Sequence, residues 1–555
     1  MATKTPQYKT LTTDVLVIGA GGAGLRAAIE AHNKGAKVLI VTKEYMGGAH
    51  TSMAMGGLNV AIKAPATPKQ HFEDTVNGGW HINNYKMAKI FTKEMPARIY
   101  DLEAYGVKFD KLPDGTFYTW RGGKQTEPLN LCAGDYTGRE MIEGLVREVK
   151  KLKIPYLDDY FVIKLFTKNK RVIGGLLMDL KTGEYTAVSA KATIIATGGG
   201  GMMYLFNTNA ESNTGEGYAW ALDLGAELVD MEMVQFHPTG MAYPPEKRGR
   251  LITEKVRGHG GMLKNKNGER FMVHYQPQRM ELAGRDEVAR AIYQEVKEGR
   301  GTNHNGVYLD VTHWKKGDVE KLIPEVLEDH EEVGIDIRKQ MMEVYPSMHH
   351  MMGGINITEW GQTTIPGLFA AGEVTRNIHG ANRLGGNSIA EGQVFGRRVG
   401  QKAAEEALTQ LRGSQQDSWQ VDVLGEIKKL EELQHRKKGK SVKEVFRALQ
   451  TVMWEYVGLI RDEKKLQHAL QEIKKLQKEA QNVVAHNKKE LQMALELQEM
   501  VKVAEAIVVA ALLRKESRGA HYRTDYPQMS TKWEKNIVVY KKGKTLHTKT
   551  APVVK

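Results

Sequence analysis

The sequence predicts an α/β protein with a dinucleotide-binding unit at its start and a bundle of helices near its end. Three observations carry this prediction. A short β-branched strand runs into the glycine pattern GAGGAG near the N-terminus, a second apolar strand ends in glycines at 191–201, and residues 424–517 repeat Leu, Lys and Glu at helical spacing. Alternating strands and helices favour the α/β class. With 555 residues, the chain is long enough for about three or four folding units.

The first unit, residues 13–41, has the pattern strand, loop, helix, strand. The strand TDVLVI is followed by Gly19, Gly21 and Gly24, then by the helical run LRAAIEAHNKG and the strand KVLIV. The first glycine permits a tight turn, the second lets the backbone approach a pyrophosphate, and the third lets helix and strand pack closely. The free N–H groups at the start of the helix then face the phosphates. We therefore predict dinucleotide binding here.

The segment after the second strand departs from the usual NAD pattern. An NAD site normally places an acidic side chain here to bind the ribose, whereas this chain has Thr42, Lys43 and then Glu44. The acidic residue comes later than usual and a lysine stands before it, so the sequence does not determine which residue contacts the ribose. A glycine-rich loop at 46–61 follows and carries His50. Its small residues can let the backbone lie against a flat ring system, and the plain alternative is that His50 is a structural loop histidine.

The next segments alternate between helices and strands. We predict a helix over 80–105, a hairpin turning at 113–115, strand-like runs over 156–188 with a turn at 168–170, and a helix opening within 213–226. Between the last two, the run KATIIATGGGG is an apolar strand that ends in glycines. This turn is a second place where backbone can pack against a dinucleotide.

Residues 233–354 contain many charged and polar residues in glycine-rich contexts. They include QFHPTG, TEKVRGHGG, LAGRD and HHMMGG, which we interpret as loops rather than amphipathic elements. Loops carry binding and catalytic residues disproportionately often, so we expect functional side chains here. Beyond this region the sequence predicts a strand at 368–373, a loop at 379–388 and a helix.

The last quarter of the chain is basic. From residue 421 to the end there are 28 Lys and Arg against 17 Asp and Glu, which accounts for most of the formal net charge of +13. Residues 424–517 predict long antiparallel helices for packing and docking, and 530–555 predict a small basic hairpin. Such a region can meet nucleic acid, an anionic membrane or an acidic partner, or it can be a solvated Lys/Glu surface. Few aromatic residues are interleaved, so no nucleic-acid partner is expected.

Composition excludes several classes of protein. The single cysteine, Cys132, excludes intrachain disulfides, CxxC redox chemistry and cysteine-held iron–sulfur clusters. No apolar run reaches the ~18 residues of a membrane span, and the N-terminus has neither an apolar signal segment nor a twin arginine. The sequence shows no metal-ligand spacing. We therefore expect a reduced, cytoplasmic protein without a metal site.

Taken together, the motifs resemble those of the flavoprotein subunits of the succinate dehydrogenase/fumarate reductase family. The matching segments occur in the family's order and extend from residue 17 to residue 527. They are VIGAGGAG (17–24), AHTSMAMGG (49–57), ATGG (196–199), QFHPTG (235–240), TEKVRGHGG (253–261), LAGRD (282–286), HHMMGG (349–354), HGANRLGGNS (379–388) and ESRGAHYRTDYP (516–527). Each motif alone is weak, whereas the ordered set is highly specific.

The resemblance implies FAD rather than NAD, and it implies a domain order. It predicts a discontinuous, Rossmann-like FAD-binding domain (1–232 and 350–412) with an inserted α+β capping domain (233–349), followed by a helical bundle domain (413–518) and a small C-terminal domain (519–555). The substrate is then expected between the FAD-binding and capping domains. Hinged closure of the capping domain would exclude water from the reaction.

The resemblance also assigns residues to the cofactor. His50 matches the histidine through which membrane-bound members attach FAD covalently, and such a bond raises the flavin potential. The other expected cofactor-binding residues are Gly19, Gly21, Gly24, Thr42, Lys43, Thr51, Gly56, Gly57, Glu216, Glu373, Ser388 and Ile389. Glu216 stands where the family usually has aspartate, which is a conservative change.

A C4 dicarboxylate substrate requires cationic and hydrogen-bonding groups at both of its ends. A buried unpaired charge is strongly destabilising, and arginine offers bidentate recognition of a carboxylate. By resemblance, two pairs of residues hold the two carboxylates, namely His349 with Arg383 and His237 with Thr253.

The same resemblance assigns the proton transfer. Arg285 matches the family's proton-transferring arginine, and Glu254 and Arg257 match its relay. In the family, hydride passes between flavin N5 and one substrate carbon, while the proton moves at the adjacent carbon. Arginine is an unexpected acid, because its unperturbed pKa is about 12.5 or higher, so close packing of charges is expected around it.

The implied activity is the interconversion of succinate and fumarate. The implied partners are an iron–sulfur subunit and membrane anchor subunits that pass electrons to or from the quinone pool. Through these partners the chain is expected to lie peripherally on the inner face of the cell membrane. Two departures keep an alternative open: Gly138-Arg139-Glu140 is similar to L-aspartate oxidases, and His350 replaces a usual tyrosine. A soluble L-aspartate oxidase or soluble fumarate reductase is therefore the alternative, although such soluble relatives generally lack the histidine at position 50.

Overall fold

The largest sheet in the described part of the chain combines parallel and antiparallel strands. The computed structural model describes residues 7–410 and 420–555. In this described part the largest sheet has seven strands in the order β6-β2-β1-β9-β8-β7, with β16 paired to β9. The strands are β1 (Tyr8–Ile18), β2 (Val38–Val41), β6 (Tyr156–Leu157), β7 (Tyr160–Lys168), β8 (Arg171–Asp179), β9 (Tyr185–Ile195) and β16 (Leu368–Ala370). The predicted hairpin at 168–170 joins β7 to β8.

The predicted strand–loop–helix–strand unit is confirmed. β1 pairs in parallel with both β2 and β9, and Ile18 lies opposite Val41 and Ile195. Parallel strands end at the same edge of a sheet, so the glycine-rich turns after β1 and β9 lie against each other. A Cβ on Gly19 would come within 2.2 Å of the Ala196 carbonyl oxygen, and Gly19 has a φ of +110°. Both observations require glycine at this turn.

Helices cover this sheet and connect it to smaller elements. α1 (Gly22–Asn33) packs with α11 (Asn387–Thr409), and the other helices of this part are α2 (Pro68–Gly78), α3 (Tyr85–Ala104), α4 (Thr137–Lys151) and α5 (Glu216–Asp223). The hairpin predicted at 113–115 is reduced to one bridge between Lys111 and Phe117. The strands β4 (Thr119–Trp120) and β5 (Asn130–Leu131) that follow it form a three-stranded sheet with the earlier β3 (Leu58–Asn59), in the order β3-β5-β4.

Two of the polar motifs in 233–354 that were predicted as loops lie in strands. QFHPTG lies in β11 (Val234–Met241) and HHMMGG begins in β14 (Met342–Met351), and these two strands pair antiparallel. All residues of β11 are buried, so both faces of the strand are covered. The polar residues therefore point into a buried site rather than into solvent, and the alternation that identifies a half-exposed strand is absent.

This region has a hydrophobic core of its own. The described chain has here a four-stranded sheet in the order β11-β14-β13-β12, with β12 (Met262–Lys264) and β13 (Val307–Asp310). Its helices are α6 (Glu254–Gly258), α7 (Met272–Tyr275), α8 (Arg285–Lys297), α9 (Asp318–Leu322) and α10 (Pro324–Glu331). Buried Ile252, Leu263, Val288 and Val344 belong to one cluster that is separate from the main core. The proposed domain boundaries stay a prediction, and the one at 412/413 lies outside the described residues.

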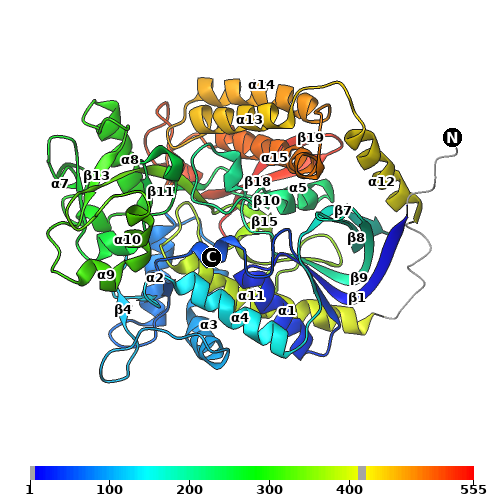
Figure 1. Cartoon of the computed structure of the whole chain (residues 1–555), viewed down its shortest axis with the longest axis horizontal. Coiled ribbons are helices and arrows are strands. Elements are labelled where there is room, and N and C mark those ends of the chain that lie inside the picture. Colours follow the sequence, from blue (N-terminus) through cyan, green and yellow to red (C-terminus); the bar gives the residue numbers. More distant parts are fainter. Residues whose placement is uncertain (1–6, 411–419) are drawn as a thin grey trace.

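The C-terminal part forms the predicted helices and hairpin. The helices are α12 (Gln420–Gln434), α13 (Val442–Tyr456), α14 (Glu463–Ala480) and α15 (Lys488–Leu513), and α13 to α15 run along one side of the molecule (Figure 1). The hairpin of β18 (Lys535–Lys542) and β19 (Thr545–Pro552) extends a sheet with β17 (Thr375–Arg376), β15 (Gly354–Asn356) and β10 (Leu228–Val229). Lysines of this region form ion pairs, such as Lys440 with Glu479 at 2.8 Å. None of the described helices combines the length and apolarity needed to cross a membrane.

Candidate functional site

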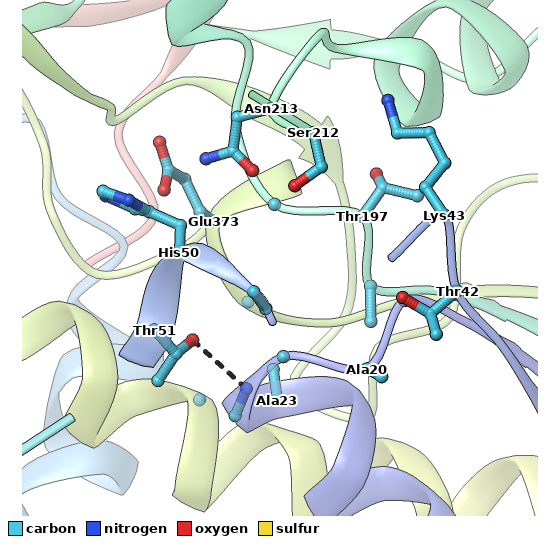
Figure 2. A pocket seen from close by; sticks show the side chains of 18 of the residues that line it. Ala20, Ala23, Thr42, Lys43, His50, Thr51, Thr197, Ser212, Asn213 and Glu373 are labelled. Atoms are coloured by element: carbon cyan, nitrogen blue, oxygen red, sulfur yellow. Dashed lines mark hydrogen bonds between the residues drawn. The ribbon is translucent and has the colours of Figure 1, made fainter. Parts of the chain in front are cut away.

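A long cavity lies at the carboxyl edge of the large sheet. It encloses about 1280 Å³ of space free of protein atoms, its opening to solvent included. Segments far apart in sequence line it: the turn after β1, residues 41–44 after β2, the loop 49–54, the turn 196–198 and residues 371–373. Figure 2 shows His50 and Glu373 at one end, Thr42 and Lys43 at the other, and Ala20 and Ala23 between them.

The floor of the cavity is the start of α1. Gly21 precedes the helix, and the Gly22 N–H donates to Oγ1 of Thr51 at 3.2 Å, the bond drawn in Figure 2. A Cβ on Gly21 would meet no atom closer than 3.4 Å, whereas one on Gly24 would lie 2.0 Å from the Gly19 carbonyl oxygen. Gly21 therefore leaves room at the cavity, and Gly24 permits close packing of the helix.

Most of the residues predicted to hold the cofactor line this cavity. They are Gly19, Gly21, Thr42, Lys43, His50, Thr51, Glu216, Glu373, Ser388 and Ile389. Gly24, Gly56 and Gly57 do not line it: Gly57 packs against the Leu131 carbonyl and Gly56 faces Oγ1 of Thr253. The direct cofactor contacts of these ten residues stay a prediction.

Lys43, whose role the sequence left open, is held by two carboxylates. Its Nζ lies 2.6 Å from Oε1 of Glu216 and 2.9 Å from Oε1 of Glu496 on α15, and it also donates to Oγ1 of Thr214 at 2.6 Å. Burial alone would lower the pKa of Lys43, but the two carboxylates outweigh burial and raise it. Its side chain is directed away from the glycine-rich turn in Figure 2. This cation therefore anchors the helical region to the wall of the cavity.

At the other end of the cavity, one ring nitrogen of His50 lacks a hydrogen-bond partner in the described part of the chain. This nitrogen, Nδ1, is buried. Burial lowers the pKa of His50, so the ring is neutral at pH 7. Oγ1 of Thr197 and Nε1 of Trp220, also in the cavity lining, likewise have no partner in the described part of the chain. A glycine cradle with unpartnered polar atoms above it fits a dinucleotide cofactor.

Two arginines and two histidines converge beside His50. Nη2 of Arg383 lies 2.7 Å from Nε2 of His349, whose ring lies 6.2 Å from that of His50 and 5.0 Å from that of His237, between centroids. Oε1 of Gln235 accepts from Arg285 at 3.0 Å and from Arg383 at 3.4 Å. This single oxygen therefore joins the guanidinium groups of two chain segments.

The electrostatics of this cluster favour an anion. Burial, followed by the nearby arginines, lowers the pKa of both His237 and His349 well below the usual range, so both imidazoles are neutral. Burial and the charge of Arg285 lower the pKa of Arg383 to about 9, which leaves it charged at pH 7. Buried arginines with neutral hydrogen-bonding histidines provide what a dicarboxylate needs.

Arg285 is also tied to an acid. Its Nε donates to Oε2 of Glu254 at 2.7 Å, and Arg257 approaches the same oxygen at 3.5 Å. Burial alone would raise the pKa of Glu254, but the two arginines outweigh burial and lower it to about 2. Thr253 lies one residue earlier, where its side chain caps α6 by accepting from the Lys255 N–H. The predicted relay residues are therefore brought together, while their roles stay predictions.

Sequence reasoning missed several residues of the site. Gln235 lies in a motif that was recognised, but no role was assigned to it. Thr208, which bonds Nδ1 of His349 at 2.7 Å, lies in a segment without a motif. Residues 160–162 of β7 and Asn213 also line the cavity; their segments were predicted as a strand and a helix start, but no role was assigned to these residues. Only packing brings these residues to the site.

Comparison with known proteins agrees with this geometry. Residues 14–389 match the FAD binding domain family, and residues 446–554 match the fumarate reductase flavoprotein C-terminal family. A CoM/CoB fumarate reductase chain of Methanothermobacter marburgensis is 42% identical over 95% of this chain and 97% of its own. The succinate dehydrogenase flavoprotein of Coxiella burnetii is 34% identical over 96% and 94%.

Solved structures give the same result. A quinol fumarate reductase flavoprotein of Escherichia coli superimposes with a TM-score of 0.94 at 32% identity, covering 99% of this chain and 97% of its own.

The chloroplastic L-aspartate oxidase of Arabidopsis thaliana is also similar in sequence, at 36% identity over 93% of this chain and 81% of its own. The predicted fold class, FAD as cofactor and oxidoreductase activity are confirmed. The chain belongs to the succinate dehydrogenase/fumarate reductase flavoprotein family and is an FAD-dependent oxidoreductase.

Proposed function

We propose that this chain is the catalytic subunit that interconverts succinate and fumarate. The observation that carries the proposal is the convergence of Arg285, Arg383, His237 and His349 beside the His50 end of the FAD cavity. We assign these donors to the two carboxylates of a C4 chain in the two sets expected from the sequence. His349 with Arg383 binds one carboxylate, and His237 with Thr253 binds the other.

Arg285 gives the proton in fumarate reduction and accepts it in succinate oxidation. Its Nε is held by Glu254 and its Nη1 by Gln235, so the guanidinium is fixed in orientation by two acceptors. Glu254 stays ionised at neutral pH and relays the proton that recharges Arg285, with Arg257 next to it in the relay. Bound FAD supplies the hydride acceptor or donor. Buried, fixed charges of this kind stabilise charge in a transition state without reorganising.

A dye-linked succinate assay tests the activity. The FAD-loaded chain is expected to oxidise succinate with an artificial electron acceptor, and Arg285→Lys is expected to lose most of this rate while it keeps FAD. Absence of turnover with both succinate and fumarate, in a chain that holds FAD, would overturn the proposal.

FAD attachment through His50 is the second part of the proposal. The neutral imidazole with an unpartnered nitrogen at the end of the cavity supports it. Acid precipitation tests it directly: flavin fluorescence is expected to stay with the precipitated protein and to move to the supernatant in His50→Ser. Free flavin from the native chain would contradict attachment without affecting the proposed reaction.

The third part concerns the electron partners. We propose an iron–sulfur subunit, together with membrane anchor subunits linked to the quinone pool, which would place the chain peripherally on the inner face of the membrane. A chain with one cysteine needs another polypeptide to hold cysteine-ligated clusters, and the quinol fumarate reductase match supports this. Purification of the tagged chain from its own cells is expected to bring along a cysteine-rich partner with an iron–sulfur spectrum.

L-aspartate oxidase or a soluble fumarate reductase is the alternative function. The segment 138–140 and the similarity to the Arabidopsis protein favour it. However, Arg139 is exposed, pairs with Glu325 at 3.3 Å and does not line the FAD cavity. Oxygen-dependent turnover of L-aspartate, without dye-linked turnover of succinate, would decide for the oxidase.

A further inference from the structure

A second group of buried ionisable residues lies beside the FAD cavity. His350 follows His349 on β14, and because successive strand residues point to opposite faces, the two imidazoles have different neighbours. Nδ1 of His350 lies 3.3 Å from Oε2 of Glu373, and both residues line the cavity. The ring of His350 meets that of His379 edge-on, with centroids 5.0 Å apart. The proposed reaction uses neither His350 nor His379.

These two histidines contain nitrogens that no described residue satisfies. Nε2 of His350 and both ring nitrogens of His379 are buried without a hydrogen-bond partner. His350 is 2% exposed and His379 is 3% exposed. A buried polar atom without a partner is costly and calls for an explanation. An apolar side chain would fill the same space at lower cost, so the free nitrogens point to a chemical role.

The charges around His350 determine when it can hold a proton. Burial lowers its pKa well below the usual range, and Arg383, His50 and Arg285 lower it further, so the ring is neutral at pH 7. Glu373 faces it from residues 372–374, and burial raises the pKa of that carboxyl. Glu391 on α11 interacts in turn with Glu373 and Arg383. Burial, together with Glu373, raises the pKa of Glu391 to about 8, so this carboxyl is protonated and adds no charge. One further negative charge in the cavity would therefore raise the pKa of His350 and favour its protonated form.

We propose that His350 takes up one proton from solvent when the FAD in this cavity is reduced, and releases it on reoxidation. Uptake of two electrons and one proton would give the flavin a net negative charge. Nε2 of His350 then binds a second proton. No electron enters the imidazole, and the only bond formed on the protein is the Nε2–H bond. Glu373 stabilises the resulting imidazolium through Nδ1.

Geometry selects His350 among the neighbouring histidines. His349 is engaged by Arg383 and Thr208, and His379 has no carboxylate partner and does not line the cavity. His50 is the proposed attachment point of FAD. Glu373 also acts electrostatically on His50. Among these four histidines, however, only His350 has a carboxylate oxygen of the described chain in direct contact, and it also lines the cavity and has a free buried nitrogen. The inference requires bound FAD but does not require the dicarboxylate reaction.

The test is the pH dependence of the FAD midpoint potential. It is measured by spectroelectrochemical titration of the FAD-loaded chain between pH 6 and 8, without dicarboxylates. For a two-electron couple a tenfold change in equilibrium constant corresponds to ~30 mV, so each proton taken up contributes that amount per pH unit. We expect a slope of ~60 mV per pH unit in the native chain and ~30 mV in both His350→Phe and His350→Gln.

Two variants and one control make the result decisive. His350→Gln keeps a polar group near Glu373, so it remains informative if His350→Phe loses FAD. His330→Phe is the matched control, because His330 is another buried histidine with an unpartnered Nε2, in α10 and outside the cavity lining. Its slope is expected to equal the native one. A native slope of ~30 mV, or a slope of ~60 mV in the His350 variants, would overturn the proposal. Loss of succinate turnover with an unchanged slope would refute only the proposed function.

Discussion

Nη2 of Arg383 lies 2.7 Å from Nε2 of His349, and this contact determines the tautomer of the histidine. A guanidinium can only donate, so Nε2 accepts and Nδ1 carries the hydrogen. His349 therefore acts on the carboxylate by orienting Arg383, whose N–H groups are the donors at this end. Nδ1 in turn donates to Oγ1 of Thr208 at 2.7 Å. The imidazole is thereby fixed between a loop arginine and a threonine about 175 residues earlier in the chain. Its orientation depends on all three residues.

Thr208→Val should therefore weaken substrate binding without releasing FAD. Removing the acceptor of a buried N–H costs about 1–2 kcal/mol, which corresponds to roughly a tenfold rise in the KM for succinate. Thr208→Ser retains the hydroxyl and is expected to behave like the native chain. Steady-state kinetics with a dye acceptor measure the effect, and equal KM values for the Val and Ser variants would argue against it.

The lowered pKa of Arg383 predicts an alkaline limit to activity. Burial and the charge of Arg285 lower this pKa to about 9. The guanidinium is charged below that value and loses its charge as pH rises through it, so kcat/KM should be flat from pH 7 to 8.5. Above about pH 9 it should fall roughly tenfold per pH unit, because kcat/KM reports the free enzyme. A flat profile to pH 10.5, with FAD still bound, would contradict this.

Two glycines of the first turn should respond differently to alanine. In Gly24→Ala the new Cβ lies 2.0 Å from the Gly19 carbonyl oxygen, so the helix must move and the free energy of unfolding should fall by about 3 kcal/mol. In Gly21→Ala the nearest atoms are 3.4 Å away, so the fold is retained and the methyl group enters the cavity instead. We expect a thermally stable Gly21→Ala that binds FAD at least roughly tenfold more weakly. Equal stability of the two variants would refute the distinction.

Lys43 should be essential for the stability of the fold because it forms ion pairs with two buried carboxylates. Lys43→Met leaves Glu216 and Glu496 without their cation, and their side chains are only 3% and 7% exposed. Breaking a buried ion pair in this way costs about 3–5 kcal/mol. Lys475→Met removes an exposed lysine that pairs with Glu472, and it should cost less than ~1 kcal/mol. Denaturant unfolding compares the two, and a similar loss in both would contradict the role of Lys43.

Asp135 should make the contact between α10 and the loop before α4 sensitive to pH. Its carboxylate accepts from the Glu325 and Val326 N–H groups, and burial raises its pKa to about 6. Because the folded pKa lies above the unfolded one, this group stabilises the fold below about pH 4, and the contribution is lost as pH rises through about 6. Asp135→Asn cannot ionise and keeps an amide oxygen as acceptor. Its stability relative to the native chain should therefore increase by about 1–3 kcal/mol between pH 4 and 7. Thermal unfolding at several pH values measures this, and a constant difference would rule it out.

Sequence reasoning succeeded where the cause is local. The turn at Gly19 and the packing at Gly24 follow from sterics within a few residues and from the neighbouring strand, and α13 to α15 follow from helical spacing. It was wrong about the motifs QFHPTG and HHMMGG, which were predicted as loops. His237 and His349 lie in paired strands with both faces buried, and no alternation of polar and apolar residues marks such strands.

By itself, the sequence determined the glycine-rich cofactor turn, the helical C-terminal region and the family to which the chain belongs. Only the tertiary structure decided that His349 lies between Arg383 and Thr208, that Gln235 joins two arginines, and that Lys43 is held by an acid from α15. The physical reason is the range of the forces. Turn sterics and helix periodicity act between near neighbours in the chain, whereas a buried charge is satisfied by whichever distant segment the packing of sheets and helices brings to it.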